Sequence, residues 1–587
     1  MKGFFKKVLV INLSARSFHE EGIPDEVYRK FLGGKGLGVY LMLKRNKPGV
    51  DALSPENNFI IGVGPVNDTR IWGSSRYGVF TKSPLTGLFS HSYSGGRIAE
   101  PISRTGYDAI ILEGASSEPV FLVVGISGVE FHDAGDIWGS DTYQTEDFVL
   151  KKVGLKGAGA LVIGPAGENL VRFANVTNNY WRCAGRTGVG AVLGSKKVKA
   201  IVFYGNKERE VADPEAIERF SKEWCEKAKT HPSFSFFKNI GTPGLVSIIN
   251  TFEGFPTRYW HEGSMEGWED ISAETLHSSY SVKPHACHRC LLTCGRLTTV
   301  REGRHKGLKI EGPEYETIYA FGGLCLIGRL DEIIYLNDIC DRLGMDTITG
   351  GNLAAFAIEA SQMGKIREKI EYGDVDGIAN LLYSISRREG IGDVLAEGIS
   401  HAAAKWGLED IAIHVKGMEP GGYDPRIFKG MGLAYATSDR GACHLRSTVF
   451  RAEIAGVIPP DQIEGKAEVF IDYEDRLTLQ DSLILCRFYR DIYLWDEFAY
   501  IIQATTGMNM EKEDLQRIAS HIQSATRVFN IKEGLTRADD TLPPRFFEEA
   551  IGSKKSVITR EQLERLKDDY YKLRGWDEEG VPSISSQ

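Results

Sequence analysis

Three cysteines lie within eight residues of one another, at Cys287, Cys290 and Cys294. The spacing is C-x2-C-x3-C, and a loop of this length can turn three thiolates inward onto one metal centre. A [4Fe–4S] cluster takes four cysteine ligands, so a fourth must come from elsewhere in the chain. Spacing alone does not choose among the remote candidates, which are Cys325, Cys340, Cys443 and Cys486.

Two other uses of these cysteines compete with an iron–sulfur cluster. Structural zinc takes four Cys or His ligands, often as two knuckles. The chain has no second C-x2-C pair, although His285 or His288 could complete a zinc site. Disulfides are disfavoured, because the nine cysteines are odd in number and spread through a chain with no recognisable export signal. The spacing therefore favours an iron–sulfur cluster, with zinc as the alternative.

The elements that must position this loop change in character along the chain. Up to residue 208, short apolar runs alternate with Gly, Pro and Ser, a pattern typical of a sheet-rich domain. Strands are expected at residues 7–12, 58–62, 109–112, 120–124, 160–163 and 200–203.

Helical spacing dominates from residue 209 onward. Asp213 is expected to cap a helix over residues 214–229 that begins with Pro214. Further helices are expected at residues 330–343, 350–363, 378–388, 392–406, 474–493, 495–505 and 512–529.

A turn-rich stretch at 415–423 divides the helical part of the chain. We therefore expect an α+β multidomain protein with a β-rich domain at 1–208 and helical domains at 209–415 and 416–587. The cysteine loop falls in the middle domain.

Composition excludes several classes of protein. The 587-residue chain has 42% hydrophobic and 25% charged residues, as a globular protein does. Its net charge of −9 argues against a nucleic-acid binder, which usually has a basic excess. The apolar runs are far shorter than the ~20 residues of a membrane-spanning helix. We expect a cytoplasmic protein that neither inserts into membranes nor binds nucleic acid.

Two glycine-rich segments do not fit nucleotide-binding motifs. Residues 34–38 (GKGLG) miss the G-x-G-x-x-G spacing of a dinucleotide site, and residues 185–196 end in G-S-K rather than the G-K-[ST] of a P-loop. Neither NAD nor ATP binding is predicted.

Beyond the cysteine loop, ordered sequence blocks run along nearly the whole chain. The first domain holds TKSPLTG (81–87), GYDAIILEG (106–114), IGPAGENLVRFA (163–174) and AGRTGVGAVLGSK (184–196). The loop CHRCLLTCGR is followed by EGPEYET (311–317), DRLGMDT (341–347), ATSDRGACH (436–444) and DSLILC (481–486). In these blocks and their order, the chain resembles the tungsten-containing aldehyde:ferredoxin oxidoreductase family.

The resemblance implies an oxidoreductase that converts aldehydes to carboxylic acids. The β-rich domain would bind a tungsten atom held by two molybdopterins, with Mg²⁺ between the pterin phosphates. One [4Fe–4S] cluster would pass the electrons to ferredoxin or to an iron–sulfur partner subunit.

The resemblance also assigns roles to residues. It makes Cys486 the fourth cluster ligand. The D-x-x-G-M-D motif at 341–346 and the D-x4-C motif at 481–486 would bind the pterin rings, since carboxylates accept paired hydrogen bonds from pterin N–H groups. The backbone carbonyls of Tyr93 and Cys183 would hold the magnesium ion. The expected cofactor-binding residues are Arg76, Tyr93, Arg182, Cys183, Gly185, Asp341, Gly344, Asp346, Asp481 and Leu485.

Glu316 and His444 match the family's residues beside the metal. The carboxylate would take a proton from the attacking water, and the imidazole would polarise the carbonyl or relay a proton. Glu314 competes with Glu316 for this role, and the register of GPEYE favours the second glutamate. Cys443 and Cys325 are expected to be buried small hydrophobes. Cys325 is also considered as a metal thiolate, as in a related reductase branch.

Two alternatives stay open. One is a low-potential reductase of the same family, acting on an aromatic CoA thioester as the benzoyl-CoA reductase catalytic subunit does. The other is a zinc-stabilised binding protein without redox chemistry. A homodimer or a hetero-oligomeric complex is expected to form in another way than through iron, because the E-x-x-H pair that bridges subunits in some archaeal members is replaced by YLND at 335–338.

Overall fold

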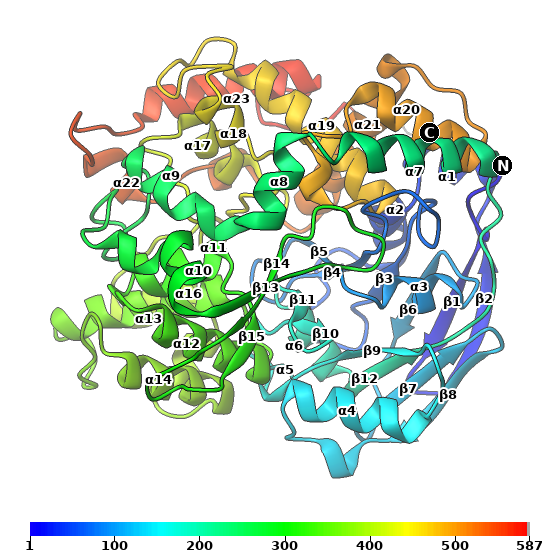
Figure 1. The fold of residues 1–587 in the computed structure, drawn as a ribbon, viewed down its shortest axis with the longest axis horizontal. Helices are drawn as coiled ribbons and strands as arrows, with labels where there is room; N and C mark the ends of the chain where they lie inside the picture. Colours follow the sequence, from blue (N-terminus) through cyan, green and yellow to red (C-terminus); the bar gives the residue numbers. More distant parts are fainter. Residues whose placement is uncertain (584–587) are drawn as a thin grey trace.

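A computed structural model describes residues 1–583. Two six-stranded mixed sheets pack face to face in its N-terminal third, and the helical part of the chain lies beside them (Figure 1). The first sheet has the order β2-β1-β6-β3-β4-β5 and contains β1 (Lys7–Asn12), β2 (Ser17–Gly22), β3 (Phe59–Gly62), β4 (Tyr77–Lys82), β5 (Phe89–Ser94) and β6 (Ala109–Glu113). The second has the order β11-β10-β9-β12-β7-β8 and contains β7 (Val120–Gly125), β8 (Gly128–Asp133), β9 (Gly159–Val162), β10 (Val176–Asn178), β11 (Arg182–Ala184) and β12 (Val198–Phe203).

Strand β1 shows why the first sheet is buried on both faces. Leu9 and Ile11 belong to the core shared by the two sheets, whereas Val8 and Val10 belong to a core shared with helices. Because side chains alternate between the faces of a strand, burial on both faces gives an unbroken apolar run. The six expected strands are all present. The other six strands of the two sheets were not predicted; one of them, β5, reads FSHSYS and is nonetheless largely buried.

Helix α2 (Gly34–Arg45) carries the first glycine-rich segment, and its glycines allow close packing. A Cβ at Gly38 would lie 2.5 Å from the ring of Phe80. Gly34 has a φ of +42°, and a Cβ there would lie 2.2 Å from the carbonyl oxygen of Asp481, in helix α19 (Lys466–Leu483). The glycines thus bring the start of one helix against the end of another.

The rest of the described chain is mainly helical, as predicted. Asp213 caps α7 (Pro214–Lys227) by accepting a hydrogen bond from the backbone N–H of Ala216 at 2.8 Å. The N-terminal sheets carry α1 (Asp25–Phe31), α3 (Ala99–Ser103), α4 (Thr142–Val153), α5 (Pro165–Glu168) and α6 (Val189–Ser195). The remaining helices are α8 (Pro232–Asn239), α9 (Leu245–Thr251), α10 (Ala273–Ser279), α11 (Tyr315–Thr317), α12 (Leu330–Leu343), α13 (Thr347–Gln362), α14 (Val375–Arg387), α15 (Ile391–Ala396), α16 (Ile399–Trp406), α17 (Lys429–Thr437), α18 (Phe450–Ile454), α20 (Trp495–Thr506), α21 (Lys512–Lys532), α22 (Pro544–Glu548) and α23 (Arg560–Arg574).

A third, three-stranded sheet holds the cysteine loop. It consists of β13 (Ser281–His285), β14 (Gly295–Thr299) and β15 (Lys309–Glu311). Strands β13 and β14 pair antiparallel from Ser281 opposite Thr299 to His285 opposite Gly295. The cysteines lie in the connection between these strands, so both ends of the loop are fixed by the ladder.

Two expected helices are wrong in their extent. The helix expected at 474–493 ends at Leu483, where Ile484 adopts a left-handed φ of 61°. Cys486 follows outside the helix, before the short 3-10 helix η5 (Arg487–Tyr489). The helix expected at 392–406 is divided into α15 and α16 at Gly398, whose φ is +92°. Within residues 1–583, no helix is long and apolar enough to cross a membrane.

Candidate active site

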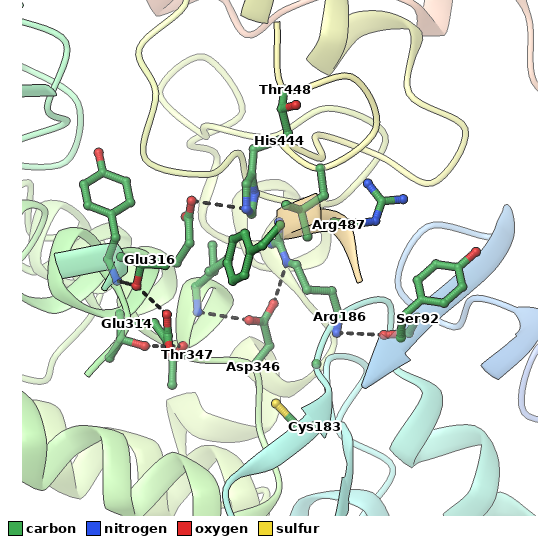
Figure 2. A pocket seen from close by; sticks show the side chains of 18 of the residues that line it. Ser92, Cys183, Arg186, Glu314, Glu316, Asp346, Thr347, His444, Thr448 and Arg487 are labelled. Carbon is green, nitrogen blue, oxygen red and sulfur yellow. Dashed lines mark hydrogen bonds and ion pairs between the residues drawn. The ribbon is translucent and has the colours of Figure 1, made fainter. Parts of the chain in front are cut away.

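A cavity of about 320 Å³ lies where strands of both N-terminal sheets meet the helical part of the chain (Figure 2). Its wall is strongly charged, with seven arginines and five carboxylates. The arginines are Arg76, Arg186, Arg440, Arg446, Arg451, Arg487 and Arg490, and the carboxylates are Glu311, Glu314, Glu316, Asp341 and Asp346. Aromatic side chains fill much of the remaining wall.

The structure gathers most of the predicted site residues at this cavity. Those that line it are Arg76, Tyr93, Cys183, Gly185, Glu316, Asp341, Asp346 and His444. Three others do not reach the wall: Gly344 ends a helix, Asp481 lies behind two arginines, and Leu485 packs in the apolar core. Arg182 borders a neighbouring hollow instead.

The D-x-x-G-M-D motif forms the junction between α12 and α13. Asp341 lies in the last turn of α12, and Gly344 ends that helix with a left-handed φ of 75°. Asp346 then caps α13 by accepting a hydrogen bond from the backbone N–H of Ile348 at 3.0 Å. The motif therefore acts as a helix cap, and it also places two carboxylates on the cavity wall.

These two carboxylates lie in different surroundings. Burial, followed by the charges of Asp338 and Glu311, raises the pKa of Asp341 well above its ordinary value. Asp346 instead accepts a hydrogen bond from Nε of Arg186 at 2.8 Å. Asp341 therefore holds a proton more readily than an ordinary aspartate, whereas Asp346 is paired with an arginine, and the two carboxyl groups can donate and accept toward a polar ligand.

Asp481 pairs with two arginines that the sequence argument did not identify. Arg446 Nη1 lies 3.0 Å from Asp481 Oδ2, and Arg487 donates to the same oxygen. Both guanidinium groups line the cavity and keep buried nitrogens without a partner, namely Nε and Nη2 of Arg446 and Nε and Nη1 of Arg487. Unpaired buried donors carry a large desolvation cost, so this side of the cavity is suited to an anionic or multiply accepting ligand.

Glu316 and His444 point toward one another at the cavity wall (Figure 2). His444 Nε2 lies 3.2 Å from Glu316 Oε1, although the pair is not well aligned as a hydrogen bond. Burial raises the pKa of Glu316 to about 8, against the opposing effects of the Gly422 N–H and Arg186. Burial, and then the positive charge of Arg186, lowers the pKa of His444 well below its ordinary value. At neutral pH, both groups are therefore mostly uncharged.

Local backbone features hold this pair. Glu316 lies in the short helix α11, which continues into a π-helix, η4 (Ile318–Gly323); such helices occur often at functional sites. Gly422 N–H donates to Glu316 Oε2 at 3.1 Å. A Cβ at Gly421 would lie 2.6 Å from His444 Nδ1, and one at Gly422 would lie 2.7 Å from the ring of Tyr319. Because glycine has no Cβ, the backbone at Gly421 can lie against His444 and the backbone at Gly422 can lie against Tyr319.

The four predicted cluster ligands lie near one another. Gly73 joins their two segments, because its N–H donates to the carbonyl of Arg289 at 3.1 Å and its carbonyl accepts from the N–H of Cys486 at 2.9 Å. Burial, and then the Cys287 and Cys486 thiols, raises the pKa of Cys290 to about 12. Among residues 1–583, no three His, Cys, Asp or Glu side chains are close enough to hold one metal ion.

Arg76 and Arg182 lie beside these cysteines. Arg76 lines the cavity, and its Nη1 is 3.9 Å from Cys486 Sγ. Arg182 forms an ion pair with Glu311 and is close enough to Cys287 for their charges to interact. Arg76 therefore reaches both the cavity and the segment of Cys486, whereas Arg182 lies beside Cys287 and borders the neighbouring hollow.

Tyr93, Cys183 and Gly185 lie on edge strand β5, on edge strand β11 and just after β11. The Tyr93 hydroxyl lies 3.0 Å from Nδ1 of His91, so its side chain is engaged within the protein. Burial raises the pKa of the Cys183 thiol to about 12. The proposed use of the Tyr93 and Cys183 carbonyls is compatible with their place at the edges of the two sheets.

Cys443 is not the simple buried hydrophobe that we expected. Arg440 Nη2 donates to its sulfur at 3.0 Å. Burial raises the pKa of this thiol, but Arg440, Arg446 and Arg186 outweigh burial and lower it to about 6. Cys443 is thus predominantly a thiolate near neutral pH. Cys325 does match the expectation: it is buried, does not line the cavity, and its Sγ lies 3.4 Å from the carbonyl of Gly351.

Sequence comparisons bear on the identity of this site. Residues 8–205 match the family model for the aldehyde ferredoxin oxidoreductase N-terminal domain, and residues 219–586 match the model for domains 2 and 3 of the same family. The chain is 38% identical to the tungsten-containing aldehyde ferredoxin oxidoreductase of Pyrococcus furiosus, over 99% of this chain and 97% of that protein. It is 29% identical to the aliphatic sulfonate oxidoreductase, WOR-like subunit, of the same organism, over 99% and 96%.

A solved structure of the active site complex BamBC of benzoyl coenzyme A reductase, in complex with 1,5-dienoyl-CoA, shares the fold. Its TM-score is 0.86 at 23% sequence identity, and the match covers 99% of this chain and 96% of that chain. The expected α+β architecture, with a β-rich domain followed by helical ones, is confirmed. The chain belongs to the aldehyde ferredoxin oxidoreductase family of tungsten-containing oxidoreductases.

Proposed function

We propose that this chain oxidises aldehydes to carboxylic acids at a tungsten bis-molybdopterin centre held in the charged cavity. The observation that carries the proposal is the Glu316–His444 pair, buried at a cavity whose wall also carries arginine nitrogens without partners and the carboxylates of Asp341 and Asp346. The overall reaction is RCHO + H₂O → RCOOH + 2H⁺ + 2e⁻.

The wall of the cavity fits such a cofactor. Each molybdopterin carries a phosphate and a ring with several N–H donors. Free nitrogens on Arg446 and Arg487 suit the anionic part, and the carboxyl groups of Asp341 and Asp346 suit the ring, whereas Asp481 would act through the two arginines that it holds. We assign the carbonyls of Tyr93 and Cys183 to a magnesium ion between the phosphates and the backbone at Gly185 to the border of the rings. Gly344 and Leu485, which do not reach the wall, would contribute by positioning the two pterin motifs.

When bound, the tungsten centre would supply a two-electron acceptor. The chain itself supplies the proton chemistry. Ionised Glu316 takes a proton from the water that attacks the aldehyde carbon. His444 remains a neutral imidazole beside it, positioned to hydrogen-bond the carbonyl oxygen of the aldehyde and so polarise it. The burial of both groups keeps bulk water from competing for the same protons.

The four cysteines would hold a [4Fe–4S] cluster that carries the electrons away singly to ferredoxin or to an iron–sulfur partner subunit. Arg76 lies between Cys486 and the cavity, so it is suited to bridge the cluster and the cofactor. Asp481 and Cys486 belong to one short segment, which links the two centres through few bonds.

The test is metal analysis of anaerobically purified protein together with an aldehyde panel and a viologen dye. The proposal requires tungsten, about four irons per chain, and dye reduction that depends on an aldehyde. Protein that contains zinc in place of iron, or that reduces the dye with no aldehyde tested, would contradict it.

A reductase of aromatic CoA thioesters is the second candidate, because a solved benzoyl coenzyme A reductase complex shares the fold. A cysteine ligand at the metal would distinguish such a reductase from an aldehyde oxidoreductase. Cys325, the residue considered for it, packs against the backbone of Ala320 and Gly351 rather than at the cavity. This position favours aldehyde oxidation, and turnover of benzoyl-CoA without any aldehyde activity would reverse the choice.

A further inference from the structure

Four of the seven cavity arginines form two pairs, each beside one aspartate. Arg446 and Arg487 share Asp481, one of the carboxylates proposed for the pterins. Arg451 and Arg490 lie instead beside Asp491, which belongs to neither pterin motif. The second pair is therefore not accounted for by the proposed cofactor contacts.

Arg490 is deeply buried and only partly compensated, since its Nη1 donates to the carbonyl of Arg487 at 3.1 Å. Its side chain is 5% exposed, and its Nε has no hydrogen-bond partner. Asp491 Oδ2 lies 3.9 Å from Nε of Arg490 but 2.7 Å from Nε of Arg451. Within residues 1–583, neither arginine has another carboxylate at ion-pair distance, so two guanidinium groups share one counterion. Burial, and then the charge of Arg451, lowers the pKa of Arg490 to about 10.

Such an arrangement is costly unless an anion completes it. An unpaired buried charge is strongly destabilising, whereas a carboxylate or phosphate between two guanidinium groups forms charge-assisted hydrogen bonds. Arg451 and Asp491 are partly exposed, at 29% and 27%, so an anion can reach this end of the cavity from solvent. Arg490 marks the inner limit of the site.

Aromatic side chains lie between this arginine pair and the proposed catalytic residues. Tyr423 lies close to the arginine pair and to Glu316. The charges of Glu316, Arg490 and Arg451 therefore all act on its hydroxyl. The Tyr423 ring stacks on Phe450, with centroids 3.9 Å apart. Flat apolar walls of this kind suit an aromatic ring.

We propose that Arg490 and Arg451 form an anion subsite, and that the preferred substrate is an aromatic aldehyde with an anionic group on its ring. This inference rests on the proposed aldehyde oxidation. The aldehyde lies at Glu316 and His444, the ring lies against Tyr423 and Phe450, and the anionic group lies between the two guanidinium groups.

The first experiment compares benzaldehyde, 4-formylbenzoate and 4-formylphenyl phosphate as substrates of the anaerobic holoenzyme with a viologen acceptor. We expect kcat/KM for at least one anionic aldehyde to exceed that for benzaldehyde by about ten- to a hundredfold, mainly through a lower KM. The two anionic substrates distinguish a carboxylate from a phosphate ligand. Arg490→Gln should reduce this preference to near one, and Arg490→Lys should restore part of it.

Two further measurements keep the inference falsifiable if Arg490→Gln folds poorly. Arg451→Gln, at the partly exposed mouth, should also lower the preference, whereas Arg565→Gln on the exposed side of α23 should leave it unchanged. Calorimetry with terephthalate, the oxidation product of 4-formylbenzoate, and benzoate tests binding without turnover. Terephthalate should bind the holoenzyme more tightly, and Arg451→Gln should remove the difference.

The outcomes separate this inference from the proposed function. If no aldehyde reduces the dye, the proposed function fails. If aldehydes are oxidised but the anionic ones are not preferred, or if the arginine variants slow all substrates equally, only the anion subsite is wrong. Equal binding of terephthalate and benzoate would also overturn it, as expected if part of the cofactor already fills this end of the cavity.

Discussion

The buried Glu316 carboxyl makes the pH dependence of turnover predictable. Its pKa is raised from an ordinary 4.5 to about 8 by burial. Only the ionised form can act as a base, so the rate follows the ionised fraction. That fraction is about a tenth at pH 7 and about a hundredth at pH 6. We therefore expect kcat/KM to rise about tenfold per pH unit up to pH 8 and to level off above it.

The assay is anaerobic dye reduction between pH 6 and pH 9.5 with an uncharged aldehyde. Titration of His444 should add no second inflection to the pH profile in this range, because its pKa is lowered well below the ordinary value and the imidazole stays neutral. Glu316→Gln should lower kcat/KM at pH 9 by about a hundredfold or more and should flatten the profile. Tungsten and iron contents, measured on the same samples, separate a lost base from a lost centre.

Glu314→Gln is the matched variant, because Glu314 lies two residues away and also lines the cavity. It accepts a hydrogen bond from Thr242 rather than facing His444, so it should retain the shape of the pH profile. A wild-type profile that stays flat below pH 8 would refute the role of Glu316. A flat profile in Glu314→Gln, with a normal one in Glu316→Gln, would transfer that role to the other glutamate.

Three other changes have defined outcomes. Cys486→Ala should lower the iron content and the visible absorbance of the cluster, whereas Cys225→Ala, at an exposed site, should leave both intact. Asp481→Asn should lower the tungsten content, because it removes the carboxylate shared by two cavity arginines; full tungsten occupancy would exclude this residue from cofactor binding. Gly34→Ala places a Cβ 2.2 Å from backbone at a φ of +42°, so it should lower the free energy of unfolding by about 1–3 kcal/mol. Gly49→Ala, which has a φ of +78° but meets no atom, separates the φ effect from the clash in thermal melts.

Local sequence spacing was enough to predict the parts of this site that are formed by residues close together in the chain. Asp341 and Asp346 are five positions apart, so their place at a helix junction follows from the capping glycine between them. The resemblance to a known family then indicated Glu316 and His444, and the structure brings them to 3.2 Å.

Features that depend on distant contacts could not be predicted in this way. The arginines around Asp481 are ordinary in sequence, and only the fold gathers them. In sequence, Cys443 resembles a small buried hydrophobe, and only the structure places Arg440 where it donates to the sulfur. The end of α19 was missed because an isoleucine, rather than a glycine, adopts the left-handed conformation at residue 484.

The hydrogen bonds of Gly73 have a consequence for how the enzyme matures. This one residue, from the N-terminal domain, holds the backbone of the cysteine loop and that of Cys486 at the same time. We therefore expect the four thiols to reach their final arrangement only after the segment of Gly73 has packed against both the cysteine loop and the segment of Cys486. Iron insertion would thus report on complete assembly, and a chain truncated before residue 486 would expose three thiols with no closed cage to fill.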